Sequence, residues 1–212
     1  MIKDNLSAIL SSIPSEVTLV AVSKTKSVDR INEAYESGQL DFGENKVQEM
    51  VEKAALLPKN IRWHMIGHLQ RNKVKYIAPF VSLIQSVDSS RLLNEIEKQG
   101  KKNERVIDCL LQVRIAQEET KFGLTYKDCD SLLQKFDCTN VRIRGLMGMA
   151  SFTANQYQIE IEFRSLLEYY NQHQPQQQWD ILSMGMSGDY PLALTCGSNM
   201  IRVGSSIFGA RN

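Results

Sequence analysis

The segment SLIQSVDSSRLLNEIEKQGKKNERVIDCLLQVRI (residues 82–115) contains the unit from which the fold is built. Its two ends, residues 82–88 and 105–115, are rich in β-branched and other apolar residues and predict buried strands. Between them, residues 89–102 place apolar side chains at helical spacing among charged ones, which predicts an amphipathic helix. Two strands joined by a helix pair in parallel through a right-handed crossover.

The same unit recurs on both sides of this segment, with no linker or shift of composition to divide the chain. Six further apolar runs predict strands over residues 17–23, 40–44, 61–67, 141–149, 179–185 and 200–204. Helical patterns follow or separate them over residues 28–38, 45–57, 70–78, 126–136, 154–173 and 189–197. A Gln-rich turn with Pro175 is expected to end the longest helix.

A doubly wound open sheet and a closed barrel both satisfy this alternation, and eight units favour the barrel. The first 13 residues, MIKDNLSAILSSI, have helical spacing and precede the first strand. We therefore predict one domain over residues 1–212, an α/β fold formed by a single (β/α)8 TIM-type barrel with an extra N-terminal helix.

The composition narrows the class of ligand. The 212 residues are 42% hydrophobic and 23% charged, a balance typical of a folded chain rather than a disordered one. Lys and Arg total 25 against 24 Asp and Glu, so there is no overall basic field for nucleic acid. This balance favours a small-molecule ligand or a limited protein interface.

The cysteines and the N-terminus indicate the compartment. Cys109, Cys129, Cys138 and Cys196 lie at irregular spacing without a CxxC pair, which predicts reduced thiols and no zinc site. The N-terminal residues lack the continuous apolar core of a signal peptide or a membrane span. We expect a cytoplasmic protein.

A barrel of this type places its functional groups at the carboxyl-terminal ends of the strands. Polar residues follow the predicted strands at Lys24 and Asn45, and Gly-rich segments follow the last two strands. Glycine lets backbone N–H groups approach an anion, and the loops after strands seven and eight are where such barrels commonly hold a phosphate.

Lys24 ends an apolar run, so its ammonium would point into the mouth of the barrel. Partial desolvation lowers the pKa of a lysine and makes a neutral, nucleophilic amine accessible, which can form a Schiff base with a carbonyl. The alternative is a solvated lysine at a strand end. Lys26 is a second candidate for the same role.

Arg202 lies inside the apolar run IRV, where its charge needs an acceptor. That acceptor could be a structural carboxylate, a ring nitrogen of a ligand or a phosphate. His64 and His68 are four residues apart, but His64 lies in a predicted strand, so a shared metal is not expected and the sites include no metal.

Seven motifs in this order resemble the pyridoxal phosphate homeostasis protein family, which is similar to the N-terminal barrel of alanine racemase. They are AVSKTK (21–26), FGENKVQE (42–49), WHMIGHLQRNK (63–73), SVDS (86–89), GLMGMA (145–150), LSMGMSGD (182–189) and GSNMIRVGSSIFG (197–209). Together they extend from residue 21 almost to the C-terminus and are far more specific than any one of them.

The resemblance implies that pyridoxal 5′-phosphate (PLP) is held as an aldimine on Lys24, with Arg202 facing the pyridine nitrogen. It further implies N–H groups of Gly204 and Ser205 on the phosphate, with Ser183, Met184 and Ser198 bordering the same site. Asn45 and His64 are implied to line the ring side. Asn199 stands where the family usually has Thr, so a hydroxyl contact there is in question.

The same resemblance implies a carrier that takes part in PLP homeostasis, without a catalytic residue. An arginine cannot protonate the pyridine nitrogen, so carbanions would be poorly stabilised, and the chain ends without the further domain that supplies a second base in racemases. An amino-acid racemase or lyase that uses Lys24 is the alternative. A third possibility is a protein that delivers PLP to apo PLP-dependent enzymes. We expect a monomer without nucleic-acid or membrane partners.

Overall fold

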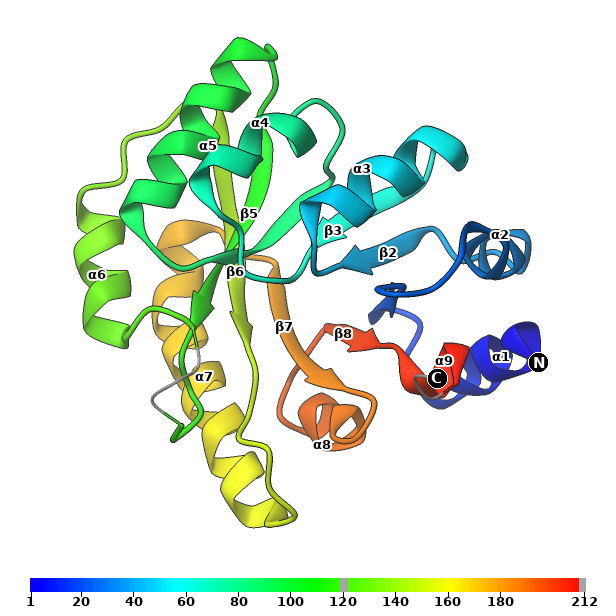
Figure 1. The fold of residues 1–212 in the computed structure, drawn as a ribbon. Helices are drawn as coiled ribbons and strands as arrows, with labels where there is room; N and C mark the ends of the chain where they lie inside the picture. The colour runs from blue at the N-terminus through cyan, green and yellow to red at the C-terminus, as the bar shows by residue number, and fades with distance from the viewer. Residues whose placement is uncertain (119–121, 210–212) are drawn as a thin grey trace.

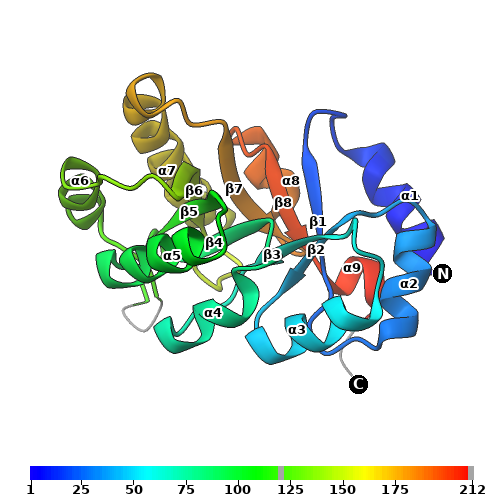
Figure 2. The ribbon, with the colours of Figure 1, turned by 90° about the horizontal axis from the view of Figure 1, so that it is seen from above.

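Parallel strands form a closed barrel in the computed structural model, which describes residues 1–118 and 122–209. Helices surround the strands on the outside (Figure 1 and Figure 2). The strands pair in chain order, and β8 returns to pair with β1. They are β1 (Thr18–Val22), β2 (Asp41–Glu44), β3 (Arg62–Met65), β4 (Leu83–Val87), β5 (Ile107–Val113), β6 (Val141–Gly148), β7 (Ile181–Met186) and β8 (Met200–Val203).

Helical segments connect the strands and carry the chain back to the amino-terminal end of the barrel. They are α1 (Ile2–Ser12), α2 (Val28–Glu36), α3 (Val47–Leu56), η1 (Arg71–Lys73), α4 (Val74–Ile77), α5 (Ser90–Lys102), α6 (Tyr126–Gln134), α7 (Gln156–Gln177), α8 (Tyr190–Thr195) and α9 (Ser205–Phe208). The predicted barrel and its eight strand–helix units are confirmed.

The predicted N-terminal helix is confirmed as α1, which lies beside α2 and α9 (Figure 1). Ile2, Leu6 and Ile9 recur at helical spacing and are buried, so one face of α1 is apolar. Asn5 Nδ2 donates to Ile207 O at 2.9 Å and ties the beginning of the chain to α9. This contact places α1 against the end of the barrel wall where β8 leads into α9.

The expected turn at Pro175 is wrong, because α7 continues through this proline to Gln177. Proline removes one backbone N–H and leaves one carbonyl of the preceding turn unpaired. Asn171, four residues earlier, is exposed, so water can satisfy that carbonyl. Among the described residues, no helix is both long enough and apolar enough to cross a membrane.

The barrel has two apolar layers, because successive side chains of a strand point to opposite faces. Most buried apolar side chains form one cluster between the strands and the helices. A smaller cluster fills the interior of the barrel and contains Val20, Leu83, Leu110, Met147, Ile181 and Met200. Residues of a strand that lie two or four positions from a member of this inner set therefore also point toward the barrel axis.

Gly145 allows β6 to approach β7 at an irregularity of the sheet. The register of β5 against β6 shifts at this point, and Gly145 has φ = +146°. A Cβ atom on this residue would lie 1.8 Å from the carbonyl oxygen of Ile181, which is backbone and cannot move aside. Glycine is therefore required here for the barrel wall to remain continuous.

Candidate functional site

The carboxyl-terminal ends of the strands bring together residues from both ends of the sequence. Ser23 N–H bonds to Gly43 O at 3.0 Å, so the ladder of β1 continues to Ser23. Lys24 is the first residue of the turn that follows, in which Lys26 N–H donates to Ser23 O at 3.0 Å, and Lys24 is partly exposed. We call this end of the barrel, with Lys24, Asn45, Gly204 and Ser205, the mouth.

Two close backbone contacts shape the mouth. A Cβ on Gly67 would lie 2.4 Å from Asn45 O, so the loop after β3 packs directly on the loop after β2. A Cβ on Gly204 would lie 3.3 Å from the Cβ of Val22, which keeps β8 close to β1. Glycines at these two positions let the neighbouring chain segments approach.

The loops after β7 and β8 are joined at the mouth. Gly204 N–H donates to Ser187 Oγ at 3.1 Å, and Met186 N–H donates to Asp189 Oδ1 at 2.6 Å. Gly204 precedes α9, which begins at Ser205. The first N–H groups of a helix have no partner inside that helix, so Ser205 and Ser206 present donors at its start.

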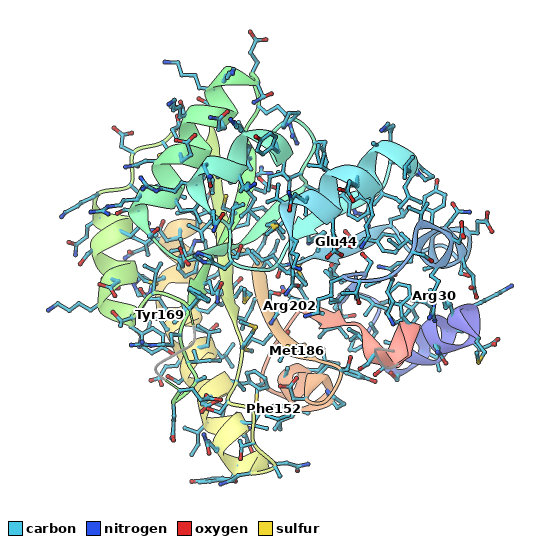
Figure 3. The ribbon with its side chains drawn as sticks, in the orientation of Figure 1. Arg30, Glu44, Phe152, Tyr169, Met186 and Arg202 are labelled. Atoms are coloured by element: carbon cyan, nitrogen blue, oxygen red, sulfur yellow. The ribbon has the colours of Figure 1, made fainter. Side chains whose placement is uncertain are left out.

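Arg202 is a buried cation at the centre of the molecule (Figure 3). Its Nη1 donates to Ser183 Oγ at 2.5 Å, and its Nη2 donates to the carbonyl oxygen of Gly148 at 2.9 Å. Within the described residues, these partners are neutral and no carboxylate forms an ion pair with the guanidinium. Burial lowers the pKa of Arg202 to about 10, which leaves it protonated at neutral pH.

A buried guanidinium without an anion is costly unless a ligand supplies an acceptor. Its contact with Gly148, the last residue of β6, places it toward the mouth. A ligand with a phosphate and a polar ring would give the mouth the acceptors that the protein does not provide there. The residues present therefore fit PLP.

A chain of hydrogen bonds, which we call the polar spine, continues from Arg202 through the barrel. Ser183 Oγ donates to Gln85 Oε1 at 2.7 Å, and Gln85 Nε2 donates to His64 Nδ1 at 3.0 Å. This places the imidazole proton on Nε2, which lies 3.0 Å from Asp41 Oδ1. The polar spine thus contains Asp41, His64, Gln85, Ser183 and Arg202.

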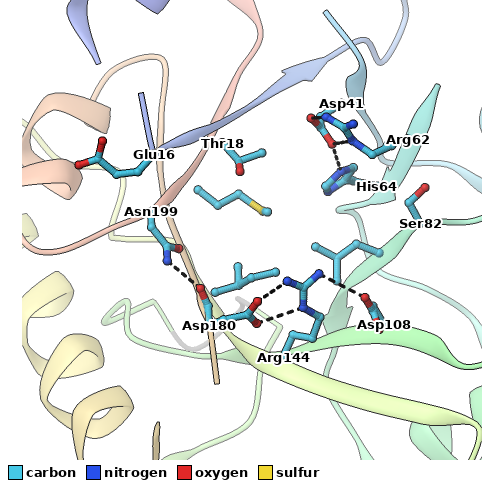
Figure 4. A pocket seen from close by; sticks show the side chains of 13 residues that line it. Glu16, Thr18, Asp41, Arg62, His64, Ser82, Asp108, Arg144, Asp180 and Asn199 are labelled. Carbon is cyan, nitrogen blue, oxygen red and sulfur yellow. Dashed lines mark hydrogen bonds and ion pairs between the residues drawn. The ribbon is translucent and has the colours of Figure 1, made fainter. Parts of the chain in front are cut away.

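The polar spine ends in a cavity of about 520 Å³ at the amino-terminal ends of the strands (Figure 4). His64 lines this cavity, and both of its ring nitrogens are engaged by protein atoms. Its implied contact with the cofactor ring stays a prediction without a supporting contact in this structure.

Asp41, Asp108 and Asp180 around this cavity are paired with arginines, whereas Glu16 accepts only from Ser15 Oγ, at 3.4 Å, among the described residues. Arg62 binds both carboxylate oxygens of Asp41, and Arg144 binds Asp108 and Asp180 (Figure 4). Burial raises the pKa of Asp41, but hydrogen bonds from Arg62 and His64 outweigh it and lower the pKa to about 2. The two arginines at the amino-terminal end are therefore bound to carboxylates. The guanidinium of Arg202, which lies toward the mouth, has only neutral partners among the described residues.

Three residues of the implied site lie in the barrel wall. Ser198 precedes β8, and its Oγ accepts from Met184 N–H at 3.2 Å and lies 2.8 Å from Met184 O, the shortest of three backbone carbonyl contacts available to its one proton. The side chain of Met184 is buried in the cluster between strands and helices. Asn199 accepts from Leu182 N–H and donates to Asp180 O, both at 2.8 Å. Cofactor contacts by Ser198 and Met184 stay predictions, and the amide of Asn199 serves to join β7 to β8.

The histidines do not converge on a metal. His68 is exposed, binds Asp88 Oδ2 through Nδ1 at 2.9 Å and stacks on Phe122. Within residues 1–118 and 122–209, no group of three or more His, Cys, Asp or Glu side chains could hold a metal ion. Lys26 Nζ donates to Gly209 O at 3.3 Å, at the edge of the mouth.

Sequence reasoning did not identify Asp41, Gln85 and Ser187 as part of this arrangement. A signal was present for the first two, because Asp41 in LDFG and Gln85 in SLIQSVD are polar residues within predicted buried strands. Their parity would have placed them inside the barrel. Ser187 lies in a loop, and no periodicity constrains its orientation.

The closed barrel and its mouth define a class of protein. The model of the family described as "Alanine racemase, N-terminal domain" matches residues 1–212. Alanine racemase from Bartonella henselae superposes with a TM-score of 0.76 at 16% identity, over 99% of this chain and 58% of that one, which shows the fold alone. PipY of Synechococcus elongatus PCC7942, in a structure with PLP bound, superposes with a TM-score of 0.92 at 34% identity, over 99% and 100% of the two chains.

Two curated relatives define the family more closely. The pyridoxal phosphate homeostasis protein of Haemophilus influenzae is 40% identical over 203 residues, which cover 92% of this chain and 86% of that protein. The protein of the same name in Escherichia coli K12 is 33% identical and covers 100% and 94%. The chain belongs to the pyridoxal phosphate homeostasis protein family.

We expect Asp41→Asn to lower the free energy of unfolding at pH 7 by about 2 kcal/mol, the equivalent of a pKa lowered from 3.8 to about 2. Because the folded-state pKa is lowered, this contribution is complete above the unfolded value and is lost as the pH falls through about 2. Urea unfolding at several values between pH 7 and pH 3 measures it. The exposed Asp137→Asn is the control, and a difference from wild type that does not shrink with falling pH would contradict the assignment.

Proposed function

We propose that this protein binds PLP at the mouth of its barrel, covalently through Lys24, and acts as a reversible carrier in PLP homeostasis. The observation that carries the proposal is the buried guanidinium of Arg202, which has neutral partners and lies toward the same end of the barrel as Lys24. The PLP bound in the PipY structure and the names of the curated relatives support it.

PLP supplies an aldehyde that condenses with a primary amine with loss of one water. Lys24 would provide the amine, from the turn that directly follows β1 at the mouth. Ser205 would provide a backbone donor for a phosphate at the start of α9, whereas the N–H of Gly204, the residue before this helix, is already donated to Ser187 Oγ. Asn45 lies on the loop after β2, which is separated from β8 only by β1, and its amide would be available to the ring substituents.

Arg202 provides a fixed positive donor for the ring of the cofactor. Ser183 and Gly148 hold two of its nitrogens, so the guanidinium cannot turn freely. Arginine keeps its proton at neutral pH and therefore donates to a ring nitrogen without protonating it. A ring that stays neutral is a weak electron sink, and this favours storage of the cofactor over its use in amino-acid chemistry.

The positions of the tyrosines also support a carrier. Racemization needs acid–base groups on two faces of the substrate, and all seven tyrosines of this chain lie in the helices that surround the barrel. The hydroxyls of Tyr126, Tyr169 and Tyr190 are bonded to Ser165, Asp130 and Ser12. Delivery of PLP to apo-enzymes and a monomeric state stay predictions.

We expect Lys24→Ala to abolish covalent binding, because it removes the amine that bonds to the aldehyde. Purified protein is incubated with PLP, reduced with borohydride and mapped by peptide mass spectrometry. Lys26→Ala, two residues away, is the matched control and should retain the adduct on Lys24. An adduct of undiminished amount in Lys24→Ala would place the site on another lysine.

We expect Arg202→Met to weaken PLP binding about 10- to 150-fold, since a hydrogen bond to a buried charged group contributes about 1.5–3 kcal/mol. The absorption maximum of the bound cofactor should shift as well, because the charge next to the ring is lost. Absorbance titration measures both, with the surface variant Arg91→Met as control. Wild-type affinity and spectrum in a folded Arg202→Met would separate this residue from the cofactor.

We expect no production of the opposite enantiomer when the PLP-loaded protein is incubated with L-alanine. Chiral chromatography of the amino acid over several hours measures it. Production of the opposite enantiomer that is lost in Lys24→Ala would instead support the racemase alternative. That alternative is tested because the chain shares its fold with alanine racemases.

A further inference from the structure

A buried ion-pair network lies directly behind the loop that carries Lys24. The structure assigns to Lys53, with Glu44 and Glu49, the role of positioning Lys24 by clamping the backbone on both sides of it. This inference rests on the proposed function, since it concerns how Lys24 is presented to the cofactor. Lys53 comes from α3, and Glu44, labelled in Figure 3, ends β2.

Lys53 donates to three acceptors, which matches the three protons of its ammonium group. Its Nζ lies 2.9 Å from the carbonyl oxygen of Ser23, 2.7 Å from Glu44 Oε1 and 3.2 Å from Glu49 Oε2. Lys53 is 7% exposed and Glu44 is fully buried, so this contact is shielded from water. Lysine is rarely buried to this degree unless its charge is paired.

Ser23, the residue before Lys24, is held by both its backbone and its side chain. Its Oγ donates to Glu44 Oε1 at 2.6 Å, its N–H donates to Gly43 O, and its carbonyl accepts from Lys53. Ser23 itself is fully buried on the helix-facing side of β1. Fixing Ser23 fixes the residue at which the turn that carries Lys24 begins, since Lys26 N–H donates to Ser23 O at 3.0 Å.

Thr25, the residue after Lys24, is held in an unfavourable conformation. It has φ = +63°, a left-handed value that a β-branched residue rarely adopts. Its N–H donates to Glu49 Oε2 at 2.9 Å, and the same carboxylate oxygen accepts from Lys53. The sharp turn that this value produces leads the chain away from the mouth directly after Lys24.

The network therefore connects the residues on either side of Lys24 to a single ammonium group. Loss of that group would leave the buried carboxylate of Glu44 without its cation and release the carbonyl of Ser23. Burial already raises the pKa of Glu44, and Lys53 opposes this effect. The partners of Lys53 Nζ are Ser23 O, Glu44 and Glu49, none of which belongs to the mouth, so Lys53 is a positioning residue and not a catalytic one.

A role in positioning Lys24 can be separated from a general role in holding the mouth together. Pyridoxine 5′-phosphate has the ring and the phosphate of PLP but no aldehyde, so it cannot bond to Lys24. A displaced Lys24 should slow the covalent reaction with PLP and leave the affinity for pyridoxine 5′-phosphate unchanged. General damage to the mouth should weaken both.

The test compares wild type, Lys53→Met and the control Lys59→Met, whose lysine is exposed and bonded only to Ala54 O among the described residues. For Lys53→Met we expect the rate of borohydride-trapped adduct on Lys24 to fall about tenfold or more, because small misplacements of a reacting group have effects of this size. The dissociation constant of pyridoxine 5′-phosphate should stay within about twofold of wild type. Wild-type trapping, or an equal loss of trapping and of pyridoxine 5′-phosphate binding, would overturn the proposal.

If Lys53→Met does not fold, the variant Glu49→Gln tests the proposal in its place. It keeps the size of a partly exposed side chain and removes the negative charge that accepts from Thr25 N–H. It should slow trapping several-fold, and an unchanged rate would overturn the proposal. Hydrogen exchange of the Thr25 amide gives a readout without cofactor. Should wild type form no adduct on Lys24, the proposed function fails, while faster exchange at Thr25 in the variants would still support the clamp.

Discussion

Pairing of β8 with β1 is the constraint on which the rest of the structure depends. Thr18 to Ala21 align with Met200 to Val203 in parallel, and this contact closes the barrel. Closure places β1, which leads into Lys24, beside β8, which carries Arg202, although the two strands come from opposite ends of the sequence. An open sheet with the same elements would leave β1 and β8 to be edge strands with unpaired backbone groups.

The interior of the barrel combines apolar packing with the polar spine. TIM-type barrels are normally filled by layers of branched apolar residues, and one such layer is present here around Val20 and Leu110. The polar spine passes through this packing, and its middle members are side chains without a formal charge. The positive charge of Arg202 and the negative charge of Asp41 therefore lie at opposite ends of the spine. Asp41 is neutralised by Arg62, whereas Arg202 keeps an unmatched charge near the mouth.

The barrel could be predicted from the sequence because each strand–helix unit has its own local pattern, and eight such units are compatible with few topologies. The sequence also predicted that Lys24, Asn45 and Gly204 follow the carboxyl-terminal ends of their strands. It did not predict the hydrogen bonds that His64, Ser183 and Ser198 make inside the barrel wall, since a motif gives residue order but not the partners of each side chain. Pro175 was misjudged because propensity at an exposed helix end is weak against the continuing helix. The clamp around Lys53 required knowledge of which helix residue faces which loop.

The two ends of the barrel show why a roomy cavity is a poor guide to the ligand site here. In the cavity at the amino-terminal end, both arginines already bind carboxylates, so a ligand of these arginines would have to replace existing ion pairs. At the mouth, the helix start of α9 and the guanidinium of Arg202 have donors to offer, and Lys24 is held at its edge. The ion pairs and the proposed PLP site thus lie at opposite ends of the same strands. Binding energy for PLP can therefore come from interactions that folding itself does not consume.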